Sequence, residues 1–287
     1  MVRLLHVTDI HFGCENKAAV AAVGELARGG GFDAVIQSGD ITMVGAEPEF
    51  RAAAAWLKSL PGPVVSTPGN HDTPELDVLT RLTRPWDLYE RYIGPVRNDG
   101  LVAPGLNVQT MNTARGVQIR LNWSKGAVDH DDAHALCERL NRTPKGDLKV
   151  AVCHHPLMEV TGGPMTGRVR GGTEAARIIA EGGADLILTG HVHTPFAHAL
   201  PFGDCRTYAV GAATLSMRER GAPAGYSCIE ADDETIRITA MGWVGGKFEA
   251  QRSWGFTRRG VDPRPSEGEQ QALAQEAGGG EAIAARV

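Results

Sequence analysis

The chain has 287 residues, of which 42% are hydrophobic and 22% charged, as is ordinary for a soluble globular protein. This length is enough for one large α/β domain with a sizeable core. The formal net charge of -5 gives no sign of a polyanion-binding surface, so nucleic acid is not a favoured partner.

In the first third of the chain, strand-like and helical stretches alternate in short units. The predicted elements are strands at residues 3–8, 33–38 and 63–68 and amphipathic helices at 16–28 and 47–60. Asn16 is expected to cap the first helix, and the glycines from Gly29 to Gly31 are expected to end it. This alternation is typical of a mostly parallel sheet with helices on its faces.

The remaining elements are less regular. Residues 73–93 are predicted to form a helical region broken near Pro85, and the later elements are strands at 106–111, 149–153 and 184–189 and a helix at 129–140. Beyond Gly190, four β-prone runs favour an antiparallel second sheet: 196–200, 206–210, 226–231 and 235–241. Residues 260–287 are rich in Gly, Pro, Glu and Gln, so we expect a flexible tail after a domain at 1–259.

Cysteine usage and the start of the chain both indicate a compartment. The five cysteines are odd in number and form no C-x-x-C pair. Most of them lie in apolar surroundings, which favours buried free thiols in a reducing cytosol. The sequence starts with a strand-like run rather than the apolar stretch of a signal peptide, and it contains no run as long as a transmembrane helix. We therefore expect a cytoplasmic protein without a membrane partner.

Five of the strand-like runs end in polar residues that carry metal-ligand chemistry. These tips read D-I-H at 9–11, G-D at 39–40, G-N-H-D at 69–72, H-H-P at 154–156 and G-H-V-H at 190–193. Asn, Asp and Gly also favour ordinary turns, which is the better explanation of any one tip taken alone. If the five strands share a sheet, their tips converge on one edge. Such a cluster suits two divalent cations with one shared carboxylate.

In this order and spacing, the five tips resemble the calcineurin-like metallophosphoesterase superfamily over roughly residues 3–245. The resemblance implies an α/β fold, a four-layer α-β-β-α sandwich of two mixed sheets flanked by helices. It also implies two divalent metal ions, with Asp40 bridging them. The first ion would be held by Asp9, His11, Asp40 and His193, and the second by Asp40, Asn70, His154 and His191. Ligands without cysteine suit Mn, Fe or Zn.

Five further residues are given roles by position. His71 resembles the family's histidine that binds no metal but contacts the phosphate and protonates the leaving oxygen, and Asp72 is expected to orient its other ring nitrogen. The H-x-P spacing leaves His155 a supporting or packing role. Arg168 or Arg170, in the glycine-containing loop that follows the H-H-P tip, is a candidate contact for a substrate phosphate, although a solvated loop arginine is the commoner outcome.

Within the superfamily, the stretch from Gly39 to Asp72 is similar to the class III cyclic nucleotide phosphodiesterases. The Asp-Arg-Gly that protein Ser/Thr phosphatases carry after the Gly-Asp pair is absent, and Leu157 stands where the family usually has a second proline. We therefore expect a phosphodiesterase that hydrolyses cyclic nucleotides or other small phosphodiesters through a metal-activated hydroxide. A pyrophosphatase, a glycerophosphodiesterase and a metal-stabilised binding protein without turnover stay open, as does assembly into a homo-oligomer.

Overall fold

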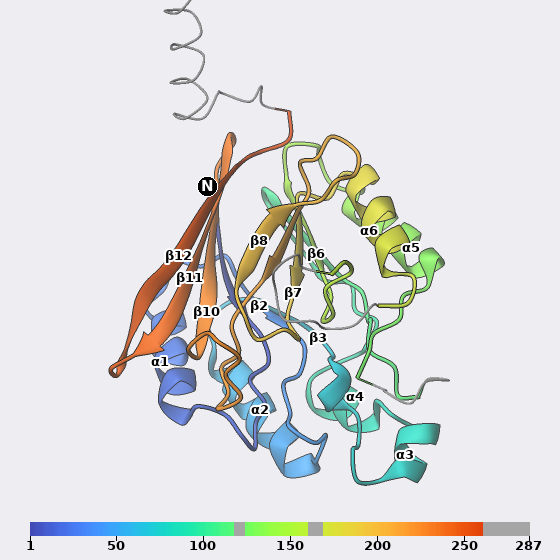
Figure 1. Cartoon of the computed structure of the whole chain (residues 1–287), viewed down its shortest axis with the longest axis vertical. Helices are drawn as coiled ribbons and strands as arrows, with labels where there is room; N and C mark the ends of the chain where they lie inside the picture. Colours follow the sequence, from blue (N-terminus) through green and yellow to red (C-terminus); the bar gives the residue numbers. More distant parts are fainter. Residues whose placement is uncertain (118–123, 160–168, 261–287) are drawn as a thin grey trace, which may run out of the picture.

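The computed structural model describes residues 1–117, 124–159 and 169–260. It contains two six-stranded sheets packed face to face, with helices on both outer faces (Figure 1). The four-layer sandwich predicted from the sequence is therefore confirmed. None of the described helices is both long and apolar enough to cross a lipid bilayer.

The first sheet has the strand order β12-β11-β10-β1-β2-β3. Its strands are β1 (Val2–Val7), β2 (Ala34–Ser38), β3 (Val64–Thr67), β10 (Gly225–Ala231), β11 (Thr235–Val244) and β12 (Lys247–Thr257). The first three strands run parallel, and β10, β11 and β12 add antiparallel neighbours on the other side of β1. Helices α1 (Lys17–Arg28) and α2 (Glu47–Ser59) connect the parallel strands, and the Asn16 side chain caps α1 as predicted.

The second sheet has the order β4-β5-β6-β7-β9-β8. Its strands are β4 (Leu101–Ala103), β5 (Leu106–Thr110), β6 (Leu148–Val152), β7 (Leu186–Thr189), β8 (Phe196–Ala199) and β9 (Tyr208–Gly211). The four central strands are parallel, and the two edge strands are antiparallel to their neighbours. Helices α5 (His130–Leu140) and α6 (Gly172–Glu181) cover its outer face (Figure 1).

One expectation about the sheets is wrong, and one condition placed on them is not met. The β-prone runs beyond Gly190 do not form one antiparallel sheet, because β8 and β9 join the second sheet whereas β10 and β11 join the first. The strands that carry the five polar tips do not share a sheet either, since β1, β2 and β3 lie in one and β6 and β7 in the other. The composition of a short strand indicates how buried it is. It does not indicate which strand will be its neighbour in the sheet, because that depends on residues far away in the sequence.

The segment that joins the two halves is broken as the sequence predicts. A short 3₁₀ turn, η1 (Asn70–Asp72), follows β3, and two helices follow, α3 (Val78–Thr83) and α4 (Asp87–Tyr92). Pro85 lies between these two helices, where its ring and missing N–H prevent a continuous helix.

The apolar core between the sheets fixes their relative position. Side chains from both sheets alternate toward it, among them Leu4 and Ile36 from the first sheet and Val150 and Leu188 from the second. Separate apolar clusters lie beneath α1, α2 and α4 on one outer face and beneath α5 and α6 on the other. Because the central strands are buried on both faces, they read as continuous apolar runs rather than alternating ones.

The two sheets are in direct contact where β1 and β7 end. Gly190 follows β7, and a Cβ placed on it would lie 1.9 Å from Thr8 Oγ1 and 2.5 Å from Asp9 Oδ2. The backbone N–H of His191 donates to Asp9 Oδ2 at 2.8 Å, which joins the tips of the two sheets directly. Only glycine leaves room for this contact.

We expect Gly190→Ala to lower the free energy of unfolding by about 1–3 kcal/mol, because the added methyl group must push the two tips apart. The matched control is Gly255→Ala in β12, where an added Cβ meets nothing within 4 Å. That variant should stay within about 0.5 kcal/mol of the wild type. Urea unfolding of chelator-treated protein measures both changes, and equal stability of the two variants would contradict the close approach.

Candidate metal centre

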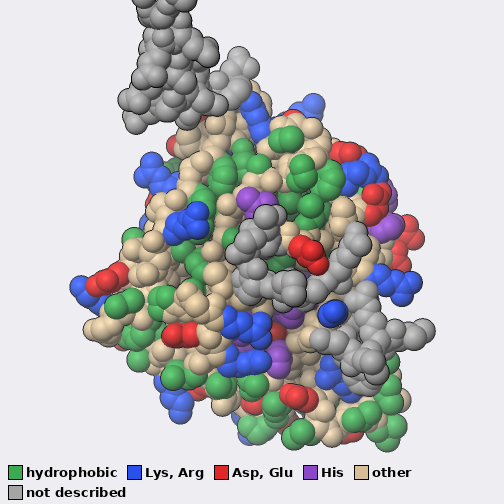
Figure 2. Space-filling view, in the orientation of Figure 1, with side chains coloured by type: hydrophobic (Ala, Val, Ile, Leu, Met, Phe, Trp, Pro, Cys, Tyr) green, Lys and Arg blue, Asp and Glu red, His purple; other side chains and the backbone are tan. Residues whose placement is uncertain are grey.

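The five polar tips lie together where the two sheets face each other. Their side chains form overlapping groups whose ligand atoms all lie within 4.8 Å of one another. One group contains Asp9, His11 and His193, and another contains Asp9, Asp40 and His154. The ring of His191 lies 5.2 Å from that of His154, measured between centroids. On the face shown in Figure 2, histidine side chains lie beside Lys and Arg side chains near the middle of the molecule.

The backbone at the tips is strained. Among the described residues other than glycine, those with positive φ are Asp9, His11, Asp40, His191, His193 and Cys205, with φ between 48° and 68°. All of these except Cys205 are ligand candidates from the sequence. Left-handed backbone is costly for such residues and concentrates at functional sites, where the surroundings hold it in place. The strain therefore supports a site built to aim these side chains.

Three buried ligand-type atoms at the centre make no hydrogen bond. They are Asp9 Oδ1, Asn70 Oδ1 and His154 Nε2. Two of them have a charged neighbour, since His193 Nε2 lies 3.1 Å from Asp9 Oδ1 and His154 Nε2 lies 3.1 Å from Asp40 Oδ2, but neither pair has hydrogen-bond geometry. Buried polar atoms are normally paired. Oxygen and imidazole nitrogen atoms left open in this way fit divalent cations.

Three of the histidines are anchored to backbone carbonyls through Nδ1. The distances are 3.1 Å from His11 to Thr42 O, 2.9 Å from His154 to Ser38 O and 2.7 Å from His193 to Arg218 O. A carbonyl oxygen only accepts, so each Nδ1 carries a proton, and the lone pair of such a ring in its neutral form lies on Nε2. This arrangement turns the Nε2 atoms toward the cluster.

Burial and the nearby carboxylates set the charges at the centre. Burial lowers the pKa of His11 to about 4 and that of His191 to about 3, so both imidazoles are neutral at neutral pH. Burial alone would raise the pKa of Asp40, but His154 beside it holds that pKa well below its ordinary value. Burial alone would lower the pKa of His154, but Asp40 raises it to about 9. Neutral imidazoles and ionised carboxylates are the forms that bind metal, so His154 must lose its second ring proton when an ion binds.

His71 lies at the rim of this cluster and is held from two sides. Its Nδ1 donates to the carbonyl oxygen of Met43 at 2.6 Å, and its backbone N–H donates to Asp40 Oδ1 at 2.8 Å. Its Nε2 lies 3.1 Å from the guanidinium Nη1 of Arg218, which can only donate. His71 Nε2 is therefore an acceptor in this arrangement.

The prediction that Asp72 orients His71 is wrong. The buried Asp72 carboxylate accepts from the backbone N–H groups of Ile41, Thr42 and Gly69 and from the hydroxyl of Thr42. Burial, together with the charge of Asp40, raises the pKa of Asp72 to about 6. Neighbouring residues of the 3₁₀ turn point in different directions, so the carboxylate holds the loop after β2 while the ring of residue 71 turns to Met43.

A second carboxylate holds the same loop, and the sequence analysis gave it no role. Glu49 Oε2 accepts from the backbone N–H groups of Met43, Val44 and Ala46 at 2.9–3.2 Å. These bonds fix the Met43 carbonyl that orients His71. The available signal was the position of Glu49 in the first turn of α2, three residues after Ala46, because acidic side chains there reach back to free backbone N–H groups.

The remaining candidates make no described contact with the cluster's open atoms. His155 is buried next to His154 and His191, with both ring nitrogens bonded, to Thr113 Oγ1 and to the Ser124 carbonyl at 2.9 Å each, which fits a supporting role. Arg168 lies outside the described residues. The backbone of Arg170 pairs with residues 126–128, and its exposed side chain makes no described contact with the cluster.

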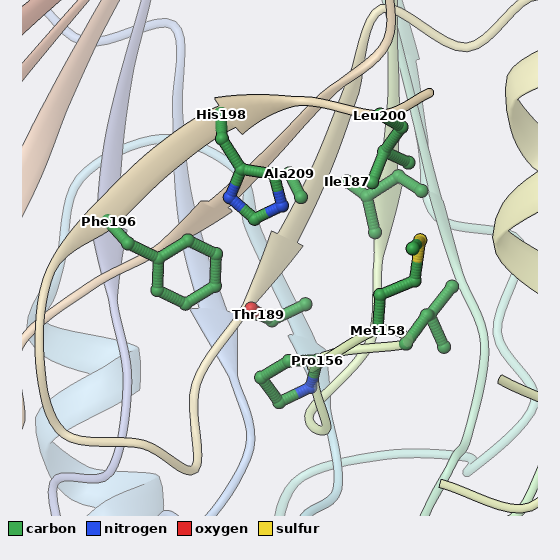
Figure 3. A pocket seen from close by; sticks show the side chains of 9 residues that line it. Pro156, Met158, Ile187, Thr189, Phe196, His198, Leu200 and Ala209 are labelled. Carbon is green, nitrogen blue, oxygen red and sulfur yellow. The ribbon is translucent and has the colours of Figure 1, made fainter. Parts of the chain in front are cut away.

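Two hollows lie on the second sheet. One is a narrow apolar pocket of about 10 Å³ beside the H-H-P tip, where Pro156 and Met158 face Phe196 and His198 from β8 (Figure 3). The other is a cleft of about 660 Å³ lined by residues from α4, α5 and the segment 95–115, including Trp86, Asn98 and Asn112. The first has room for about one water molecule, whereas the second has the size of a ligand site.

The sequence is similar to that of a known protein over most of its length. A probable cyclic nucleotide phosphodiesterase from Synechococcus sp. is 24% identical over 255 residues, which are 84% of this chain and 92% of that protein.

Solved structures show the same fold at lower identity. GAP50, the anchor in the inner membrane complex of Plasmodium, has a TM-score of 0.59 and 11% identity over 90% of this chain and 89% of its own. Purple acid phosphatase PPD1 from yellow lupin (Lupinus luteus) seeds has a TM-score of 0.55 and 12% identity over 90% of this chain and 54% of its own. A family model for the calcineurin-like phosphoesterases matches residues 2–195, and the chain belongs to that family.

Proposed function

We propose that this chain is a two-metal phosphodiesterase that hydrolyses small phosphodiesters, cyclic nucleotides among them. The observation that carries the proposal is the set of buried oxygen and imidazole nitrogen atoms left open where the tips of the two sheets meet. The likeness to a probable cyclic nucleotide phosphodiesterase supports the substrate class.

The proposed ligand assignment is the one that the family resemblance implies. Asp9, His11, Asp40 and His193 would hold one ion, and Asp40, Asn70, His154 and His191 would hold the other. The 3.3 Å between His11 Nε2 and His193 Nε2, both lone-pair atoms, supports a shared cation there, because two lone pairs repel without one. When bound, such a pair of ions polarises a phosphoryl oxygen and supplies a nucleophilic hydroxide.

The protein's own groups complete the reaction. His71 binds no ion in this proposal, and its ring is held at Nδ1 by the Met43 carbonyl. It serves as the acid for the leaving oxygen once Nε2 has taken up a proton from water. Asp72 and Glu49 act through the loop they bind, which keeps that carbonyl in place. An ester oxygen of ribose is a poor leaving group, so a positioned acid matters more for it than for an activated phenol.

The cleft lined by Trp86, Asn98 and Asn112 is the proposed site for the organic part of the substrate. Strands β5 and β6 are parallel, with Thr110 opposite Val152, so Asn112 follows β5 at the level where His154 follows β6. The cleft therefore begins one strand away from a proposed metal ligand. Its aromatic and amide side chains suit a nucleobase, which stacks and forms hydrogen bonds.

The metal requirement is the first test of this function. We expect about two divalent ions per chain after reconstitution with Mn, Fe or Zn, and loss of diesterase activity with a chelator. Elemental analysis and turnover of bis(p-nitrophenyl) phosphate measure the two quantities. Full activity of thoroughly metal-free protein would remove the basis of the proposal.

Ligand and acid roles are separated by comparing Asp40→Ala with His71→Ala. Asp40→Ala removes the shared bridge, so metal content and turnover should fall together. His71→Ala should keep its metal while turnover falls by about 10²–10⁴. His130→Ala on the exposed start of α5 is the matched control and should change neither quantity. Equal loss of metal in His71→Ala and Asp40→Ala would refute the acid role.

Substrate preference tests the diesterase assignment. We expect a higher kcat/KM for bis(p-nitrophenyl) phosphate than for p-nitrophenyl phosphate, together with measurable hydrolysis of 2′,3′- or 3′,5′-cyclic AMP. The organic cleft favours a substrate with a group on each side of the phosphorus, and the monoester has only one. Chelator-treated protein serves as the blank. A clear preference for the monoester would refute the diesterase while leaving the metal centre intact.

A further inference from the structure

We propose that Arg218 binds the phosphoryl group of the substrate at the rim of the metal centre, and that it leaves His71 to do so. The inference rests on the proposed function, because it takes the ligand to be a phosphodiester anion. It concerns a residue to which the sequence analysis gave no role, in the segment between β9 and β10.

The backbone around Arg218 is fixed to the same tips that carry the ligand candidates. Thr214 Oγ1 donates to the Asp9 carbonyl at 2.6 Å, and the N–H of Met217 donates to the Cys14 carbonyl at 2.9 Å. The carbonyl of Arg218 itself accepts from His193 Nδ1 at 2.7 Å. The side chain therefore starts from a defined point beside the cluster rather than from a free loop.

In the described part of the chain, the Arg218 guanidinium has N–H groups without an acceptor and forms no ion pair with a carboxylate. Its Nη1 lies 3.1 Å from His71 Nε2 and 3.7 Å from Met43 Sδ, and the residue is half-buried. Within the described ranges, no carboxylate lies within ion-pair distance of it. By contrast, Arg177 pairs with two glutamates and Arg97 with Asp132. A guanidinium that keeps only neutral partners beside a phosphate site is available to an anion.

Binding a phosphoryl oxygen also changes what His71 can do. A charge-assisted bond from guanidinium to phosphate is stronger than one to a neutral imidazole, so the anion displaces His71 as the partner of Nη1. The ring stays in place through its bond to the Met43 carbonyl, and Nε2 then faces the substrate with no donor on it. Substrate binding therefore also removes the Arg218 donor from His71 Nε2.

The test measures binding of inorganic phosphate to the metal-reconstituted protein by calorimetry, with metal content and diesterase kinetics on the same samples. Arg218→Ala should weaken phosphate binding by about 10- to 100-fold and raise KM, with metal content unchanged. Arg218→Lys keeps the charge but not the planar fork, so its binding should fall between the two. Arg220→Ala removes an exposed cation from the same segment and should stay within about twofold of wild type.

Three results would overturn the inference. They are an unchanged phosphate affinity in Arg218→Ala, loss of metal in both Arg218 variants, and no phosphate binding by the wild type at millimolar concentration. If Arg218→Ala does not fold, the phosphate affinity, metal content and KM of Arg218→Lys test the inference instead. A wild type that binds phosphate through Arg218 but hydrolyses no diester would refute the proposed function and leave this inference standing.

Discussion

One hydrogen bond joins the two sheets at the place where the candidate site forms. The backbone N–H of His191, at the tip of β7, donates to the carboxylate of Asp9, at the tip of β1, and Gly190 leaves the space for it. The same aspartate is tied to the first sheet through its own N–H, which donates to the Gly39 carbonyl, and to the β9–β10 segment through Thr214. The geometry of the whole cluster depends on this junction, because its members come from both sheets.

Two carboxylates, the buried one of Asp72 and the half-buried one of Glu49, accept hydrogen bonds mainly from the backbone. Asp72 and Glu49 between them bind N–H groups at five positions of the 41–46 loop, and Asp72 also binds that of Gly69 in the turn before His71. Burying a carboxylate is costly, and several N–H donors offset that cost. Their effect is to hold an irregular loop in place, so that the Met43 carbonyl can serve as the fixed partner of the His71 ring.

The sequence predicted what depends on neighbouring residues and missed what depends on distant ones. Strand tips, the Asn16 cap and the break at Pro85 are local, and the helical and strand periods locate them. The sheet to which β10 or β8 belongs depends on pairing across the molecule, which no local pattern carries. Arg218 and His71 meet although they are 147 residues apart, and the arginine reaches the rim only because its segment is bound to other tips. Asp72 failed as an orienting residue because adjacency in sequence does not place two side chains together in a 3₁₀ turn.

The four histidine anchors have a consequence for genetics. Each of these histidines donates a hydrogen bond from Nδ1 to a backbone carbonyl. The pairs are His11 with Thr42, His71 with Met43, His154 with Ser38 and His193 with Arg218. Replacing a side chain at any of these four positions leaves its carbonyl oxygen in the chain. A saturation scan would therefore record Ser38, Thr42 and Met43 as tolerant wherever the new side chain fits, although their carbonyl oxygens orient histidines. Arg218 differs, because its guanidinium is the group proposed to bind phosphate. Only a change to the backbone itself, such as an ester in place of the amide, weakens such an acceptor directly. Natural amino-acid substitutions therefore do not reveal these hydrogen bonds.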